Sequence, residues 1–254
     1  MKELIYKLLD IASMGRGLQR TINGHSLRLP TRYFKYFPET YEADNFAFLH
    51  ESCKPGAVII DIGAHIGLFS VIAAQVAGKS GKVYAFEPAP GTYALLQKTV
   101  SINHAGTVIE TFQKAVGKAN GKITFFVSDN RADNSNSLVN YKDDRSLHGI
   151  DVAVTSIDDF VREKNISRLD FIKIDVEGAE YDTLQGAVHT LKHVRPACIV
   201  AIHPEPIAAK GDSLEAIYDL IAGCNYRITL DNKDFSKAAL LANTELIDLH
   251  IYPN

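Results

Sequence analysis

Residues 58–77 constrain the fold of this 254-residue chain more than any other segment. The apolar run V-I-I (58–60) ends at Asp61, and the loop G-A-H-I-G (63–67) leads directly into the helical pattern L-F-S-V-I-A-A-Q-V-A at 68–77. A buried strand that passes through a glycine loop into a helix can present backbone amides to a ligand. A second apolar run, 83–86, ends in Glu87, an acid that could bind a ribose diol. This pattern predicts an α/β fold with a nucleoside-binding loop.

The same alternation of short apolar runs and helical patterns continues along the chain. It predicts strands at 58–61, 82–87, 108–114, 169–174 and 197–202, and helices at 68–77, 91–103, 179–192 and 213–222. Strands alternating with helices of this length indicate a mostly parallel, doubly wound sheet. The last two runs, 226–230 and 246–251, predict a C-terminal antiparallel hairpin.

Two segments depart from this rhythm. Residues 1–50 form a leader with an amphipathic helical pattern, a turn at Asn23–Gly24 and an aromatic-rich stretch at 29–48, which could act as a lid or cover a sheet edge. We assign residues 51–254 to the main domain. Alternating runs at 122–127 and 150–157 flank a polar segment, 128–151, which we interpret as a loop near the substrate.

Composition narrows the choice of partners. The net charge of −3 and the pI near 6.3, without a run of basic residues, argue against nucleic acid as a partner. No stretch reaches the roughly eighteen uncharged apolar residues that a membrane span needs. Three widely spaced cysteines suggest buried thiols in a reducing compartment, and we expect a cytoplasmic protein. The sequence does not specify the oligomeric state.

The segment D-F-I-K-I-D-V-E-G-A-E (170–180) places acids at the end of another predicted strand. Asp175, Glu177 and Glu180 should lie at the carboxyl-end rim of the sheet, where open α/β sheets bind ligands. Crowded carboxylates are unfavourable unless solvent, a cation or a substrate uses them. The alternative is that they cap the helix that follows, and both roles can coexist.

The glycine spacing favours one cofactor over another. The dinucleotide pattern G-x-G-x-x-G would need a glycine where the chain has His65 and a small residue where it has Leu68. The looser G-x-G-x-G loop of S-adenosylmethionine (SAM) binders fits better, with its middle glycine replaced by His65. A nicotinamide-dependent oxidoreductase is therefore a weaker alternative, and no Tyr-x-x-x-Lys pair supports it.

The ordered set V-I-I-D-I-G-A-H-I-G, V-Y-A-F-E-P, K-A-V-G, T-S-I-D-D-F and I-K-I-D-V-E-G-A-E resembles the FkbM family of SAM-dependent methyltransferases over residues 55–205. The resemblance implies a Rossmann-like class I methyltransferase fold, SAM as the cofactor, and often O-methylation of a sugar, polyketide or other small natural product. It also implies a cofactor site formed by Asp61, Gly63, His65, Gly67, Glu87, Pro88, Ala115, Val116 and Asp175. His65 departs from the usual Asn or Gly, but histidine tolerates the left-handed backbone such a loop needs.

Methylation of a hydroxyl group requires a proton acceptor near the reacting oxygen. The candidates are Asp175, Glu177 and His203; His203 ends the predicted strand at 197–202, and an ordinary strand-end histidine is an equally good interpretation. The carboxylates that crowd the rim leave a divalent cation as an open alternative, but we assign no metal site, because paired acids on separate strands are not evident. A non-catalytic SAM-binding partner subunit is a further alternative, although the acids at 175 and 177 are present.

Overall fold

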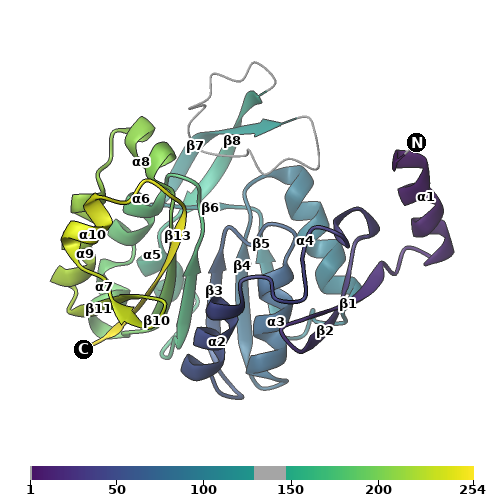
Figure 1. The fold of residues 1–254 in the computed structure, drawn as a ribbon, viewed down its shortest axis with the longest axis horizontal. Helices are drawn as coiled ribbons and strands as arrows, with labels where there is room; N and C mark the ends of the chain where they lie inside the picture. The colour runs from purple at the N-terminus through teal and green to yellow at the C-terminus, as the bar shows by residue number, and fades with distance from the viewer. Residues whose placement is uncertain (1, 129–146) are drawn as a thin grey trace.

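The computed structural model of the chain describes residues 2–128 and 147–254 (Figure 1). Its central sheet has eight strands in the order β12-β11-β13-β10-β9-β3-β4-β5, and β10, β9, β3, β4 and β5 run parallel. The strands are β3 (Val58–Ile62), β4 (Lys82–Phe86), β5 (Ile109–Phe112), β9 (Phe171–Ile174), β10 (Ala197–Ile202), β11 (Tyr226–Leu230), β12 (Lys233–Asp234) and β13 (Ile247–Pro253). The predicted mostly parallel α/β sheet is confirmed.

Helices cover both faces of this sheet (Figure 1). Successive strand residues point to opposite faces, so Ile59 packs with one helix layer and Ile60 with the other. The first layer contains α2 (Ala43–Ser52), α3 (Leu68–Ala77) and α4 (Pro90–Ile102). The second contains α5 (Ile157–Glu163), α6 (Glu180–Gln185), α7 (Val188–His193), α8 (Pro204–Lys210), α9 (Leu214–Gly223) and α10 (Lys237–Leu241). Two apolar cores, one on each side, make the sheet doubly wound.

A smaller sheet lies above the carboxyl ends of the parallel strands (Figure 1). It has the order β6-β8-β7, from β6 (Ala115–Val116), β7 (Gly121–Ser128) and β8 (Leu147–Thr155). The predicted run 150–157 begins after the true start of β8 and ends too late, because the Ser156 hydroxyl accepts a hydrogen bond from the Asp159 amide (3.1 Å) and starts α5 there. Most of the polar segment 128–151 lies outside the described residues.

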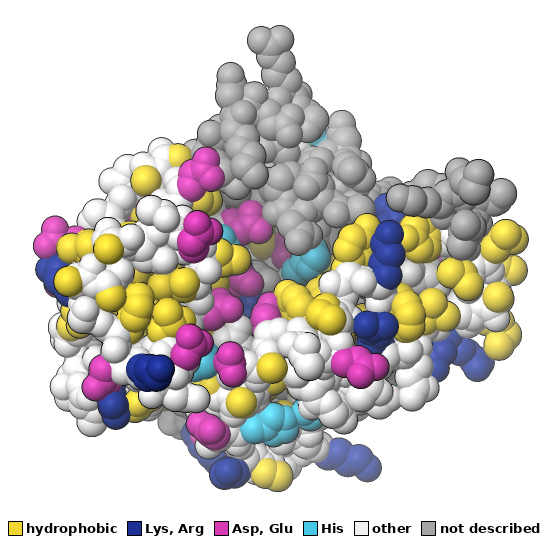
Figure 2. All heavy atoms as spheres, viewed as in Figure 1, with side chains coloured by type: hydrophobic (Ala, Val, Ile, Leu, Met, Phe, Trp, Pro, Cys, Tyr) yellow, Lys and Arg dark blue, Asp and Glu magenta, His cyan; other side chains and the backbone are white. Residues whose placement is uncertain are grey.

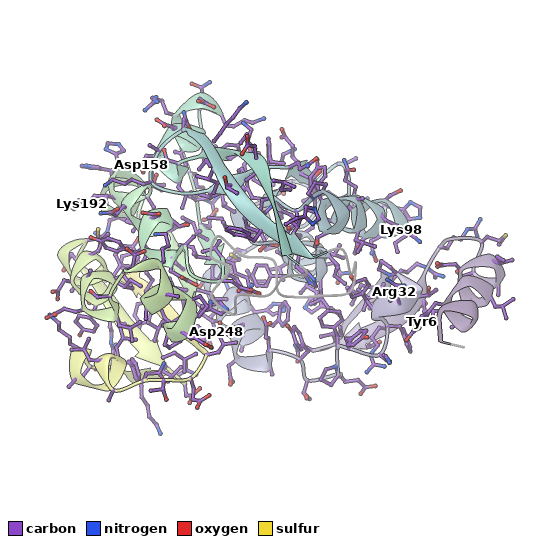
Figure 3. All side chains as sticks on the ribbon, turned by 90° about the horizontal axis from the view of Figure 1, so that it is seen from above. Tyr6, Arg32, Lys98, Asp158, Lys192 and Asp248 are labelled. Atoms are coloured by element: carbon purple, nitrogen blue, oxygen red, sulfur yellow. The ribbon has the colours of Figure 1, made fainter. Side chains whose placement is uncertain are left out.

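The leader folds onto the first helix layer. It comprises α1 (Lys2–Ala12), β1 (Leu18–Ile22), β2 (His25–Leu29), the 3₁₀ turn η1 (Thr31–Tyr33) and α2. The Asn23–Gly24 turn joins β1 and β2 as an antiparallel hairpin. Ile22, Leu29 and Phe46 are buried in the same core as α3, whereas α1 stands away from the body, at the end where Figure 3 labels Tyr6.

The single helix predicted at 179–192 is wrong: α6 and α7 are separate. Gly186 ends α6 against the backbone of Gly117, where a β-carbon would come within 2.1 Å of the Gly117 carbonyl oxygen. The Asp158 carboxylate of α5 then accepts hydrogen bonds from the amides of His189 and Thr190 and fixes the start of α7. Figure 3 shows Asp158 on the same side as Lys192 of α7. Tertiary contacts, which helical periodicity does not encode, interrupt this helix.

The C-terminal strands β11 and β13 pair antiparallel, as predicted, but they are not a simple hairpin. β12 and α10 lie between them in sequence, and β13 inserts between β11 and β10. Pro204 opens α8 at its first position, where a missing amide hydrogen does no harm. Within residues 2–128 and 147–254, no helix combines the length and apolarity that crossing a bilayer requires.

Candidate functional site

The loop after β3 turns tightly under the ends of β4 and β9. The amides of Gly63 and Ala64 both donate to the Phe86 carbonyl oxygen, at 3.0 and 2.9 Å. Gly63 (φ 77°), His65 (φ 50°) and Gly67 (φ 86°) all adopt positive φ. A β-carbon on Gly63 would lie 1.7 Å from the Asp175 carbonyl oxygen, and one on Gly67 would lie 2.6 Å from the Leu96 side chain of α4. Positive φ favours glycine at both positions, and at Gly63 the backbone contact with Asp175 requires it.

Glu87 ties this loop to the tip of β4. Its side chain is only 6% exposed, and its carboxylate accepts the amides of His65 and Ala89, each at 3.0 Å. Burial raises the pKa of Glu87 to about 7, against the two amide hydrogen bonds that lower it. Glu87 is therefore a buried, hydrogen-bonded acid and not an exposed one at a strand end. Each carboxylate oxygen has a second lone pair, so the group can still accept hydrogen bonds from a ligand.

Asp61, at the end of β3, is fully buried beside the loop. Its Oδ2 accepts a hydrogen bond from the Ser70 hydroxyl at 2.5 Å, and its Oδ1 is buried with no partner among the described residues. Burial raises the pKa of Asp61 to about 6, although Lys173 and Ser70 lower it. A buried carboxylate oxygen without a donor is unfavourable, so this atom suits a ligand that brings one.

Lys173 supplies the positive charge at the centre of the site. It lies directly opposite Asp61 in the pairing of β9 with β3, and its Nζ is 2.7 Å from Asp175 Oδ2. Burial would lower the pKa of Lys173, but Asp175, Glu42 and Asp61 outweigh it and raise that pKa. Burial would raise the pKa of Asp175, yet Lys173 and His203 hold it below its usual range. Asp175 and Lys173 therefore form an ion pair at neutral pH.

The turn after Asp175 carries the other acids of the rim. Glu177 has φ 46° and is half-buried, and burial raises its pKa to about 8. Glu180, at the start of α6, is fully buried. Its Oε1 accepts hydrogen bonds from the Gly178 amide (3.1 Å) and pairs with His203 Nδ1 (2.7 Å). Glu180 thus faces His203 rather than the free end of a helix.

These elements enclose one cleft at the carboxyl-end rim of β3, β4 and β9. Its lining includes the predicted residues Asp61, Gly63, His65, Glu87, Pro88, Ala115, Val116, Asp175 and Glu177. Gly67 lies below the cleft at the start of α3, and His203 stands behind Asp175, with its Nε2 3.7 Å from Asp175 Oδ1. The structure brings together most of the predicted site and places His203 outside the cleft wall.

Sequence reasoning missed several residues of the cleft. The position of Lys173 could have been predicted, because a lysine two positions before Asp175 in an apolar strand lies on the same face of the sheet as Asp175. The leader contributes Phe37, Tyr41 and Glu42, which no local pattern placed near the glycine loop. Asn45 of α2 links Glu42 to Asp248 on β13, at 3.2 and 2.8 Å. The leader is therefore part of the site.

The cleft is acidic. Five of its lining side chains carry carboxyl groups, and two are lysines. The carboxyl groups belong to Glu42, Asp61, Glu87, Asp175 and Glu177, and the amines to Lys114 and Lys173. Burial lowers the pKa of His65 to about 4, so its ring adds no positive charge at pH 7. Figure 2 shows acidic side chains gathered around the hollow in the middle of this face. Among the described residues, no cluster of three or more His, Cys, Asp or Glu side chains could hold a metal ion.

Comparison with known proteins adds to this geometry. The sequence model of the methyltransferase FkbM domain matches residues 61–228. The hexuronic acid methyltransferase AglP of Haloferax volcanii is 29% identical over 163 residues, which cover 64% of this chain and 62% of that protein. The 2-O-methyltransferase NoeI of Sinorhizobium fredii is 29% identical over 154 residues, which cover 56% of this chain and 62% of that protein. The chain spans about three fifths of the length of these relatives.

A solved structure shares the fold. The structure described as a putative rRNA-methylase from Clostridium thermocellum superposes with a TM-score of 0.51 at 12% identity, over 83% of this chain and 93% of that one. At this identity the likeness concerns the architecture alone.

Proposed function

Since this chain belongs to the methyltransferase FkbM domain family, we propose that it transfers a methyl group from SAM to a hydroxyl group of a small molecule. The observation that carries the proposal is the acidic cleft at the glycine loop, where Asp61, Glu87 and Asp175 meet. In this fold the glycine loop and these acids lie at the rim where open α/β sheets bind ligands.

The residues of the cleft fit SAM. The unpartnered Oδ1 of Asp61 needs a donor, and Gly63, Ala64 and His65 of the loop line the same cleft. We assign the ribose hydroxyls to Glu87, the adenine to the apolar pair Ala115–Val116, and the remaining polar groups to the loop and Asp61. When bound, SAM supplies a methyl group activated on a sulfonium. The chain holds and orients the reactants and accepts the proton.

The charge of the cleft supports SAM over a dinucleotide. SAM carries a sulfonium and an ammonium against one carboxylate, so it is a net cation, whereas the pyrophosphate of NAD is anionic. A cleft with five carboxyl side chains and two lysines offers more acceptors and anions than cations, even though the raised pKa values of Asp61, Glu87 and Glu177 leave these three only partly ionised near pH 7. The same comparison weakens the alternative of a nicotinamide-dependent oxidoreductase.

The acceptor side lies opposite the loop, where the leader meets the turn after β9. Phe37 and Tyr41 offer aromatic faces, and Glu42 and Glu177 offer hydrogen-bond acceptors. This combination suits a polyhydroxylated acceptor such as a sugar or another small natural product. The two relatives above, named for a hexuronic acid and for a 2-O position, support a sugar hydroxyl.

Calorimetry with SAM and with NAD tests the cofactor. We expect binding heat with SAM and none with NAD; heat with NAD alone would reverse the assignment. A mass-spectrometric screen of sugars, polyketides and peptides for the gain of one methyl group tests the reaction. SAM binding without product from any acceptor would favour a non-catalytic SAM-binding subunit.

We also propose a cytoplasmic location. Cys53, Cys198 and Cys224 are buried free thiols, and burial raises the pKa of each. Such thiols suit a reducing compartment. Fractionation of cells that express the chain would test this expectation.

A further inference from the structure

Four charged side chains, two that line the cleft and two behind its wall, form one ion-pair network of alternating sign. Lys173 Nζ lies 2.7 Å from Asp175 Oδ2, Asp175 Oδ1 lies 3.7 Å from His203 Nε2, and His203 Nδ1 lies 2.7 Å from Glu180 Oε1. The acids on either side of the ring raise the pKa of His203 despite its burial. With His203 protonated, two cations and two anions balance each other within this ion-pair network.

Glu180 fixes the turn that carries Glu177. It is fully buried, and its Oε1 holds both the Gly178 amide and the His203 ring. Its Oε2 is buried with no partner among the described residues, so the protonated ring is the compensation available to this carboxylate. Gly178 (φ 106°) packs so closely on α8 that a β-carbon would lie 2.8 Å from Pro206. The backbone next to Glu177 therefore has little freedom to move.

Glu177 is the rim carboxylate that has no place in this ion-pair network. Four titratable groups face it: His203 stabilises its anion, whereas Asp175, Glu180 and Glu87 oppose it. Asp175 directs both oxygens at cations, towards Lys173 and His203. A carboxylate held in an ion pair is a weak base, whereas a carboxylate among like charges is a stronger one.

We propose that Glu180 and His203 are positioning residues that hold Asp175 in this ion-pair network, so that Glu177 accepts the proton from the substrate. The inference rests on the proposed function. As the acceptor oxygen bonds to the methyl carbon, the C–S bond breaks and its electron pair stays on sulfur. The hydroxyl proton passes to the Glu177 carboxylate. His203 touches neither the cleft nor the substrate.

Carboxyl NMR on the ligand-free protein tests this division of roles. Protein labelled with ¹³C at the side-chain carboxyls of Glu and Asp is titrated from about pH 4 to pH 10, and Glu177→Gln and Asp175→Asn assign the two signals. We expect Glu177 to titrate near pH 8, as its raised pKa of about 8 implies, and Asp175 to stay ionised down to about pH 4. Removing the imidazolium with His203→Gln should raise the Glu177 midpoint by about one pH unit.

Two variants control for charge and for histidine removal. Glu205→Gln and His189→Gln alter exposed residues and should leave the Glu177 midpoint unchanged. Glu180→Gln should lower the pKa of His203, read from the ¹⁵N shifts of its ring. If either positioning variant fails to fold, the wild-type spectra still decide, because the pKa of His203 must lie above that of an ordinary histidine and Glu177 must be half-titrated near pH 8.

The proposal is overturned if Glu177 titrates near its ordinary pKa, if Asp175 titrates between about pH 6 and 9, or if His203→Gln leaves the Glu177 midpoint in place. These readouts need no cofactor, so they are separate from the failure of SAM to bind in calorimetry. In the acceptor screen, Glu177→Gln should give no methylated product, while Glu205→Gln should give as much as the wild type.

Discussion

Gly63→Ala should disrupt the cofactor loop more than an alanine at a comparable glycine elsewhere. At φ 77° an alanine carries a strain of about 1–2 kcal/mol. Its β-carbon would also lie 1.7 Å from the Asp175 carbonyl oxygen, and a normal contact of at least 3.0 Å requires the two backbones to separate by about 1.3 Å. That movement breaks the hydrogen bond from the Asp175 amide to the Ile62 carbonyl (3.0 Å), at about 1–3 kcal/mol. The expected loss of unfolding free energy is roughly 2–5 kcal/mol.

Gly24→Ala is the matched control. Gly24 has φ 81° in the β1–β2 turn, and a β-carbon there would meet nothing within 4 Å. It should lose only the strain, about 1–2 kcal/mol, and keep SAM binding. Urea unfolding measures both losses, and calorimetry should show SAM affinity reduced about tenfold or more for Gly63→Ala alone. Equal losses in the two variants, with equal SAM affinity, would refute the close approach of β3 and β9.

Three further predictions concern the buried charges. Glu87→Gln should weaken SAM binding by about 1–3 kcal/mol in calorimetry, because the glutamine side chain has one acceptor oxygen for the two backbone N–H groups and the ribose. Unchanged affinity would remove the ribose assignment. Burial raises the pKa of Asp61 to about 6 and that of Glu87 to about 7, so between about pH 4 and pH 7 the folded protein binds protons that the unfolded chain has released. The contribution of these two carboxyl groups to the free energy of unfolding should therefore fall as pH rises through this range. Urea unfolding of Glu87→Gln should show a shallower fall than that of the wild type. Lys173→Met should lower the free energy of unfolding by about 3–5 kcal/mol, because it leaves buried carboxylates uncompensated. The control Lys79→Met, at an exposed site, should change the free energy of unfolding by less than about 0.5 kcal/mol. Similar effects of the two substitutions would contradict the central role of Lys173.

Local sequence pattern was sufficient for the parallel half of the sheet. The helix at 68–77 has the predicted bounds, because glycines flank both ends of a run that is mostly apolar. The strands that end at Asp61, Glu87 and Asp175 run parallel, and parallel strands bring their carboxyl ends to one rim. Residues far apart in sequence could therefore be assigned to one site without a structure.

The remainder depends on contacts between distant segments. No local pattern shows that β13 enters between β10 and β11, or that Gly186 must stop a helix against Gly117. His203 was expected at the rim, and the buried carboxylate of Glu180 draws its ring behind Asp175. Lys173 alone could have been found from sequence, since a charged residue inside an apolar strand needs partners nearby.

The insertion of β13 has a consequence for how the chain is made. During synthesis β10 emerges from the ribosome with β9 available on one side, but its other edge pairs only with Ile247–Pro253, about fifty residues later. Until then the apolar run A-C-I-V-A-I presents an open edge to other nascent chains. Slowing translation after β10 has emerged and before β13 has emerged should therefore increase the demand for chaperones, and the same delay once β13 has left the ribosome should not.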